Sequence, residues 1–179
     1  MRRSAQIAFS LILSLVIAGC ATVDPDAPRL PRKIGTDLFA DGIARVELAH
    51  ATDGDTAAFI INGNVYDTRF LAVNTPETSH PTYGAEPWGR AAKEYTAQVL
   101  TNADEIILEL DPNSDLYDTY DRLLAWVWVD GELLNYRLVK ESYAWVMYLY
   151  GDFKYNGLMI RTESETRRDK KRIHGESDP

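Results

Sequence analysis

The sequence predicts an α+β fold in which five short strands close into a barrel, with about three helices packed around it. Three observations support this prediction. Short segments of alternating apolar residues recur, one clear helical pattern separates the third segment from the fourth, and turn residues such as Asp130-Gly131 bound the strands. This order of elements fits an OB-type barrel. Because we find no repeat and no second domain, the 179 residues supply one domain behind an N-terminal leader.

The strands are expected at residues 39–51, 57–62, 65–73, 105–110 and 122–129. The second and third strands form a hairpin whose turn is Gly63-Asn64. In the first strand the apolar positions are Ile43, Val46 and Leu48. Alternation along the hairpin predicts four side chains inside the barrel, namely Phe59, Ile61, Phe70 and Ala72.

The helices are expected at residues 88–100, 135–141 and about 155–173, and an aromatic segment at 144–150 is expected to be extended. The first helix is the clearest, because Trp88, Ala92 and Val99 fall on one face. The last helix carries a basic run, with seven Lys and Arg against three Asp and Glu between residues 154 and 172. We interpret this run as a solvated helix end, with a surface for nucleic acid or anionic lipid as the alternative.

The overall charge limits the kinds of partner. The chain has 19 Lys and Arg against 27 Asp and Glu, a net charge of −8. Arg2 and Arg3 lie in a leader without acidic residues, so the remainder has 17 bases against 27 acids, or −10. This balance argues against a protein that coats nucleic acid through bulk charge. It is compatible with an enzyme that binds a phosphodiester locally, through two arginines and a metal ion.

The N-terminus resembles a bacterial lipoprotein signal. Arg2-Arg3 precedes an apolar run at residues 7–17, too short to span a membrane, and Ala18-Gly19-Cys20 follows. We therefore expect a signal peptide at residues 1–19, a lipid on Cys20, a Pro-rich tether at 20–36, the domain at 37–175 and a tail at 176–179.

The same resemblance implies a location in the cell envelope. Ala21, the residue after the cysteine, favours onward transport to the outer membrane, with the domain facing the periplasm or the exterior. An ordinary secretory signal with an incidental cysteine, or an uncleaved anchor, stays the alternative.

Charged side chains frame the predicted hairpin. Asp53 and Asp55 precede its first strand, Arg69 lies within its second strand, and Glu77 follows that strand. Because a hairpin brings the start of its first strand beside the end of its second, Asp55 should meet residues 74–77, with Arg69 nearby. A divalent cation, an arginine and a carboxylate at one place suit chemistry on a phosphate.

This order and spacing resembles the thermonuclease family, the staphylococcal nuclease-like proteins, from about residue 40 to residue 173. Further matches are Tyr120-Asp121-Arg122-Leu123-Leu124-Ala125 and the segment 144–150. The resemblance implies a metal-dependent, Ca-type endonuclease, a hydrolase that cuts DNA, RNA or both with low sequence preference and leaves 3′-phosphate ends. The implied partners are the nucleic-acid substrate and, through the lipid on Cys20, a membrane; a monomer is expected.

The resemblance also implies a role for each matched residue. The Asp55 and Asn74 side chains and the Thr75 carbonyl would hold the divalent cation, with Ca²⁺ expected and Mg²⁺ or Mn²⁺ as alternatives. Arg69 and Arg122 would grip the phosphate, and Glu77 would act as general base. Three rings would surround the nucleotide, or serve only in packing, namely Tyr120, Tyr148 and Tyr150.

Four residues depart from the family pattern. Asn74 replaces an aspartate, so we expect weaker Ca²⁺ binding or a shifted metal preference. Asp121 replaces a glycine and places a carboxylate beside the catalytic arginine, and Thr119 replaces a lysine that contacts substrate. Ser142 stands where a glycine commonly ends the short helix; a positive φ there would cost about 1 kcal/mol.

Other functions stay open at this point. A barrel that binds nucleic acid or protein without cutting is favoured by Asn74 and Asp121, whereas the complete set of acids and arginines opposes it. A structural envelope lipoprotein without a ligand is the third class. His80, in the loop at residues 78–87, is interpreted as a solvated side chain, with contact to substrate as the alternative.

Overall fold

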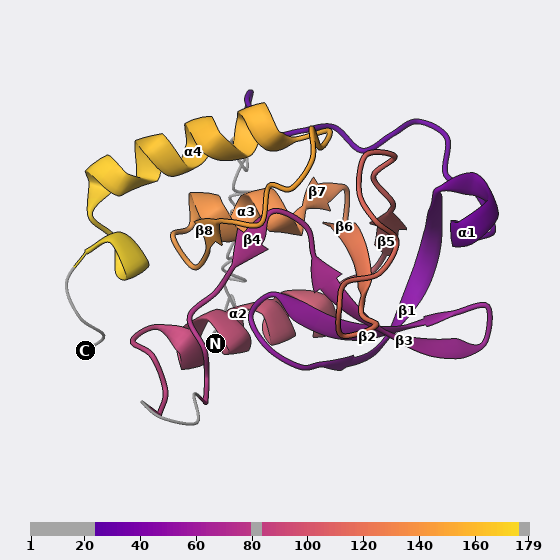
Figure 1. The fold of residues 1–179 in the computed structure, drawn as a ribbon, viewed down its shortest axis with the longest axis horizontal. Coiled ribbons are helices and arrows are strands. Elements are labelled where there is room, and N and C mark those ends of the chain that lie inside the picture. The colour runs from indigo at the N-terminus through magenta and orange to yellow at the C-terminus, as the bar shows by residue number, and fades with distance from the viewer. Residues whose placement is uncertain (1–23, 80–83, 176–179) are drawn as a thin grey trace, which may run out of the picture.

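Five strands close into a barrel in the computed structural model, which describes residues 24–79 and 84–175 (Figure 1). The barrel strands are β1 (Ile43–Ala51), β2 (Thr56–Ile61), β3 (Asn64–Phe70), β5 (Ile106–Glu109) and β6 (Leu123–Val129). Their order is β3-β2-β1-β5-β6, and a parallel pairing of β3 with β6 completes the circle. The predicted five-stranded α+β barrel of OB type is therefore confirmed.

Helices and short strands surround the barrel. They are α1 (Leu38–Asp41), β4 (Val73–Asn74), α2 (Gly89–Thr101), β7 (Glu132–Leu133), α3 (Leu134–Lys140), β8 (Trp145–Val146), α4 (Asn156–Asp169) and the 3-10 helix η1 (Arg172–His174). In Figure 1, α4 crosses the top of the view above α3, and α2 runs along the opposite side of the barrel. Within the described ranges, no helix has the length and apolarity needed to cross a membrane.

Two predicted boundaries differ from the structure because of local capping and turn geometry. The first strand begins at Ile43, since Asp37 accepts hydrogen bonds from Phe39 N–H and Ala40 N–H and so starts α1 just before it. The hairpin turn is Asn62-Gly63, one residue earlier than predicted. Both turn residues have positive φ, 50° and 80°, as a two-residue hairpin loop requires.

The later strand and helix also have the predicted type, but their boundaries differ from the predicted ones. Only Trp145–Val146 of the predicted extended segment forms a strand, β8, which pairs antiparallel with β4. The final helix ends at Asp169, because Lys170 adopts a left-handed conformation, and η1 follows. The β4–β8 pairing brings the aromatic segment beside Asn74.

The barrel interior is apolar, as the alternation of the hairpin predicts. Phe59, Ile61, Phe70 and Ala72 are all at most 3% exposed. Trp126 and Trp128 of β6 are completely buried, and their indole N–H groups donate to the carboxylates of Asp111 and Glu109. Since Ala125 lies opposite the interior residue Phe70, the alternating Trp126 and Trp128 point to the outer face of the barrel, where the two acids bind them.

Residues 24–36 lie against the domain. Leu30 and Ile34 pack on the hydrophobic core, and the Tyr136 hydroxyl donates to Asp24 at 2.7 Å. Apart from one bridge at Gly35, these residues form no helix or strand, as a Pro-rich segment predicts. The tether is therefore held on the domain over its described part. The predicted signal peptide, Cys20 and His80 lie outside the described residues.

Ser142 provides a test of backbone strain at the end of α3. Its φ is +57°, and its buried hydroxyl has no hydrogen-bond partner within the described part of the chain. Since glycine adopts this conformation freely, we predict that Ser142→Gly raises the free energy of unfolding by about 1 kcal/mol, or the melting temperature by roughly 2–4 °C. Ser142→Ala removes the hydroxyl but keeps the strained φ. Equal stability of the two variants in denaturant titrations would contradict the strain argument.

Candidate active site

Asp55 is presented by a turn that requires glycine. A Cβ atom on Gly54 would lie 2.6 Å from the Thr75 hydroxyl oxygen, so only glycine allows the two segments to approach. The Thr96 hydroxyl, from α2, donates to the Gly54 carbonyl at 2.6 Å and is completely buried. The turn before β2 is therefore fixed by α2, and Asp55 enters the site from a rigid support.

Three groups bind the Asp55 carboxylate, which is 7% exposed. The Thr75 backbone N–H donates to Oδ2 at 2.7 Å, the Thr56 hydroxyl donates to Oδ1 at 3.2 Å, and Arg69 Nη1 lies 2.7 Å from Oδ2. The start of β2 and the residues after β3 thus meet around Arg69. This confirms the convergence that the hairpin predicts.

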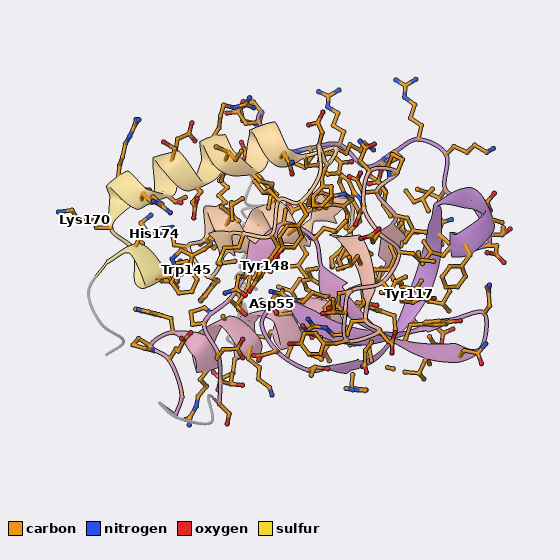
Figure 2. All side chains as sticks on the ribbon, viewed as in Figure 1. Asp55, Tyr117, Trp145, Tyr148, Lys170 and His174 are labelled. Carbon is orange, nitrogen blue, oxygen red and sulfur yellow. The ribbon has the colours of Figure 1, made fainter. Side chains whose placement is uncertain are left out.

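Arg69 is the centre of these contacts. It is 8% exposed in β3, its Nη2 donates to the Asn74 side-chain oxygen at 2.9 Å, and its guanidinium lies 5.5 Å from the centre of the Tyr148 ring. Figure 2 labels Asp55 and Tyr148 in the central part of the molecule, where both contact Arg69. The arginine is therefore ordered by an acid, an amide and a ring.

Arg122 lies beside Arg69 because of the β3–β6 pairing. Arg69 is opposite Leu124. Arg122 is the residue before β6, and the alternation of the strand, continued by one residue, puts it on the face of Leu124. The carboxylate that binds Arg122 is Asp118, which accepts from Nε at 2.7 Å and from the backbone N–H at 3.0 Å. Although burial opposes it, hydrogen bonds from Arg122 hold the pKa of Asp118 below its ordinary value.

Asp121 takes the turn position before Arg122 without pairing with it, among the described residues. It adopts a φ of +60°, as the glycine it replaces would, and its side chain is exposed. Within the described residues it forms no ion pair with Arg122, whose acidic partner is Asp118. The acid that pairs with Arg122 is therefore Asp118, and an effect of Asp121 on the arginine stays a prediction.

Three acids near the site repel one another. Partial burial, then the charges of Asp53, Asp55 and Glu86, raise the pKa of Glu77, whereas Arg69 opposes the rise. Burial and the charge of Asp55 likewise raise the pKa of Asp53, against the hydrogen bond from Gly54 N–H. The site therefore has more negative charge than Arg69 alone neutralises, and a cation is favoured there.

The residues present fit a hard divalent cation that is bound through few charges. Asp55 supplies a carboxylate, Asn74 an amide oxygen and Thr75 a backbone carbonyl, all of them ligands that Ca²⁺ and Mg²⁺ accept. In the chain that the structure describes, no three His, Cys, Asp or Glu side chains gather closely enough to hold a metal ion. Any ion at this place thus depends on the amide and on backbone oxygen.

A cavity of about 950 Å³ opens from Arg69 along the barrel. Its size is that of a nucleotide or small-molecule cleft. One wall is the loop at residues 112–120 and the other contains Tyr148, Tyr150 and Phe153. Tyr120 and Tyr150 are 78% and 87% exposed, so their faces are available to a ligand.

Comparisons with known proteins agree with this geometry. The family model described as staphylococcal nuclease homologue matches residues 67–175. The chain belongs to this family. One curated relative is the thermonuclease of Staphylococcus hyicus. It is 33% identical to this chain over 121 residues, which cover 68% of this chain and 70% of that protein.

Two longer relatives come from Bacillus subtilis (strain 168). The SPbeta prophage-derived endonuclease YokF is 39% identical over 126 residues, covering 70% of this chain and 42% of that protein. Endonuclease YncB is 38% identical over 136 residues, covering 75% of this chain and 64% of that protein. This chain therefore spans less than two thirds of the length of either Bacillus protein.

Sequence reasoning missed several residues of the site. Asp118 holds Arg122 and had no signal, since a spacing of four residues indicates an ion pair only on a helix and these residues lie in a turn. Thr96 had no signal, because its contact with Gly54 joins residues 42 positions apart. Glu86, which accepts a hydrogen bond from Glu77 N–H at 2.9 Å, was placed only in a loop.

The raised pKa of Glu77 gives a testable pH dependence. A carboxyl whose folded-state pKa exceeds its ordinary value stabilises the fold while protonated, and that stability is lost as the pH rises through the folded-state pKa. In EDTA we therefore predict that Glu77→Gln and the unchanged protein are equally stable well below pH 4.5 and that Glu77→Gln becomes the more stable at neutral pH.

The difference should be small, because Glu77 is exposed and water screens its charge. Denaturant titrations from pH 3.5 to 7.5 measure it. Glu47→Gln removes an exposed carboxylate from β1, away from the three acids, and serves as the control. A larger pH-dependent gap for Glu47→Gln than for Glu77→Gln would contradict the prediction.

Proposed function

We propose that the protein is a metal-dependent nuclease that hydrolyses phosphodiester bonds of DNA, RNA or both. One observation carries the proposal. Arg69 lies in β3 beside Asp55 and near Glu77, at the end of a cleft lined by tyrosines, and the β3–β6 pairing directs Arg122, the residue before β6, to the same face. The relatives named endonuclease and thermonuclease have related sequences, which supports the same chemistry here.

In the proposed reaction the two arginines bind the phosphate. A guanidinium presents several N–H donors in one plane and stays charged, so it matches two phosphoryl oxygens at once. Arg69 and Arg122 would neutralise charge that develops on these oxygens while water attacks phosphorus and the 5′ oxygen leaves. Because Asp55 and Asp118 already order the two side chains, little rotamer freedom remains to be lost on binding.

Glu77 would accept the proton of the attacking water. A carboxylate of ordinary pKa is a weak base at neutral pH, and burial together with the neighbouring acids raises the pKa of Glu77 and so strengthens it. Nucleases of the thermonuclease family need a divalent cation. Asp55, Asn74 and Thr75 would hold such an ion, which supplies positive charge to the phosphoryl oxygens.

The lining of the cleft suggests low sequence preference. The rings of Tyr120, Tyr148 and Tyr150 can stack on any base, since every base has an aromatic face. Thr119 supplies no positive charge at this wall. We therefore propose that stacking, with few hydrogen bonds to base edges, holds the nucleotide.

Cleavage of single-stranded DNA in EDTA, Ca²⁺, Mg²⁺ and Mn²⁺ tests this function. We predict cleavage that requires a divalent cation and is lost when Arg69→Ala and Glu77→Ala are combined. Arg122→Lys keeps the charge and removes the planar fork, so we expect kcat to fall by roughly 10²–10³. No cleavage by the folded protein with any ion would overturn the proposal in favour of a barrel that only binds.

A second prediction concerns the choice of metal. Asn74 gives an oxygen but no charge, so we predict that Asn74→Asp lowers the concentration of Ca²⁺ needed for half-maximal cleavage by about tenfold. Calcium titration by calorimetry, without substrate, checks the same change. Asn102→Asp adds one negative charge at an exposed position after α2, outside the cleft, and is the matched control. Equal affinities of Asn74→Asp and the unchanged protein would remove Asn74 from the set of ligands.

We also propose that a lipid on Cys20 anchors the protein in the cell envelope. The Arg2-Arg3 start, the apolar run and Ala18-Gly19-Cys20 support this proposal. Asp24 is bound to α3, and only about four extended residues, or roughly 14 Å, separate it from Cys20. The lipid would therefore hold the domain near the membrane.

We predict that Cys20→Ala shifts the protein from the membrane to the soluble fraction. Equal fractionation of both forms would refute the anchor.

A further inference from the structure

Two segments that face each other across the cleft are joined behind it by buried acids. The first is the loop at residues 112–120, which contains Tyr117 and Tyr120, and the second is the segment at residues 148–153, which contains Tyr148 and Tyr150. Neither segment is a helix or a strand. Backbone hydrogen bonds of Leu116 and Asp118 hold the loop on β6 and Arg122, but none within the described residues joins the loop to the segment at residues 148–153. Their separation must be set by other contacts.

Asp111 is bound from three directions at the base of the cleft. It is 4% exposed, and its Oδ2 accepts from Trp126 Nε1 at 2.9 Å and from Lys154 N–H at 2.8 Å. Its Oδ1 accepts from Asn113 N–H at 3.0 Å. One carboxylate thus connects the barrel wall, the start of the loop and the end of the aromatic segment.

Glu109 makes a parallel set of contacts two residues earlier. Its Oε2 accepts from Trp128 Nε1 at 2.8 Å and from the Tyr155 hydroxyl at 3.1 Å, and its Oε1 pairs with Lys154. The Tyr155 ring packs edge-on against both tryptophans, with centroids 5.0 and 5.9 Å away. The segment that follows Tyr150 is therefore fixed to β5 and β6.

Asn113 forms a direct bridge between the two segments. Its Nδ2 donates to the Asp152 carbonyl at 2.7 Å, and Gly151 passes so close that a Cβ there would lie 2.6 Å from the Asn113 carbonyl oxygen. The bridge lies between the tyrosines of one wall and the loop of the other. Asp111, which orients the Asn113 backbone, thereby controls both sides of the contact.

Stability alone does not account for these acids. Taking two carboxylates out of water is costly, and replacing buried ionic groups by apolar ones is often neutral or stabilising. The benefit of a fully satisfied network is a single defined geometry. Asp111 and Glu109 do not line the cleft, so they cannot act on a nucleotide directly.

We propose that Asp111 is a positioning residue that, through Asn113 and with Glu109, sets the distance between the two tyrosine-bearing walls of the nucleotide cleft. This inference rests on the proposed nuclease function. Loss of the network widens the cleft and weakens stacking on the rings. Arg69 and Glu77 lie on other supports, and backbone hydrogen bonds of Leu116 and Asp118 to Leu124 and Arg122 keep Asp118 and Arg122 together when the other wall moves. Binding of substrate therefore weakens while the chemical step proceeds.

The test uses the protein purified from its full reading frame, with kinetics on single-stranded DNA and binding of a nucleoside 3′,5′-bisphosphate. In Asp111→Asn the new amide NH₂ must face at least one of the three N–H donors that bind Asp111, so a hydrogen bond is lost. Asn113→Ala removes the bridge to Asp152 by a substitution at an exposed position. For each variant KM and the bisphosphate Kd should rise by about tenfold, with kcat within about twofold. The double variant should be no worse than the weaker-binding single one, because both act through one contact.

Asp104→Asn is the matched control, because it removes an exposed carboxylate outside the cleft. If Asp111→Asn fails to fold, Asn113→Ala and its bisphosphate Kd decide the question. Unchanged KM and Kd in folded Asn113→Ala would overturn the inference, as would additive effects, which indicate a direct contact of Asn113 with nucleotide. If the unchanged protein does not cut DNA, the nuclease proposal fails, and the ratio of bisphosphate Kd values still decides the positioning role.

Discussion

The parallel pairing of β3 with β6 is the constraint on which the rest of the molecule depends. It closes the barrel, and it is the only contact that places Thr68–Phe70 beside Leu123–Ala125 in the described sheet. Because side chains alternate along paired strands, the same register puts Arg69 and Arg122 on one face. A shift of one residue would send one arginine to the barrel interior. Closing of the core and assembly of the proposed phosphate-binding pair are thus one event.

The charge balance of the site follows from residues close to this pairing. Burial and the charges of Asp53 and Asp55 raise the pKa of Glu77, burial and the charge of Asp55 raise the pKa of Asp53, and Arg69 supplies compensating charge beside Glu77. With Asn74 in place of an acid, the amide oxygen accepts from Arg69 and adds no further repulsion. The cluster therefore has less charge repulsion than one with four acids, and it attracts a cation less strongly.

Most of the fold and the centre of the site were predictable from sequence, because both rest on local patterns. Alternation predicted the five strands, and hairpin geometry alone predicted that Asp55 would meet Asn74 and Thr75. Strand ends were less accurate where a side chain decided them, as Asp37 does by starting α1. The contacts of Thr96 with Gly54 and of Lys154 with Asp111 connect distant residues of ordinary type, so no spacing reveals them.

The two arginines differ in how many of their N–H donors and how much of their surface stay available to a ligand. Arg69 is 8% exposed and bound to Asp55 and Asn74, whereas Arg122 is half-buried and paired with one acid, Asp118, under the exposed ring of Tyr120. A guanidinium has five N–H donors, so each arginine can keep its carboxylate and still bind a phosphoryl oxygen. The acids therefore do not block the site. They hold each guanidinium in place before a ligand binds. Because the protein is acidic overall, attraction of the proposed nucleic-acid substrate is confined to these two arginines.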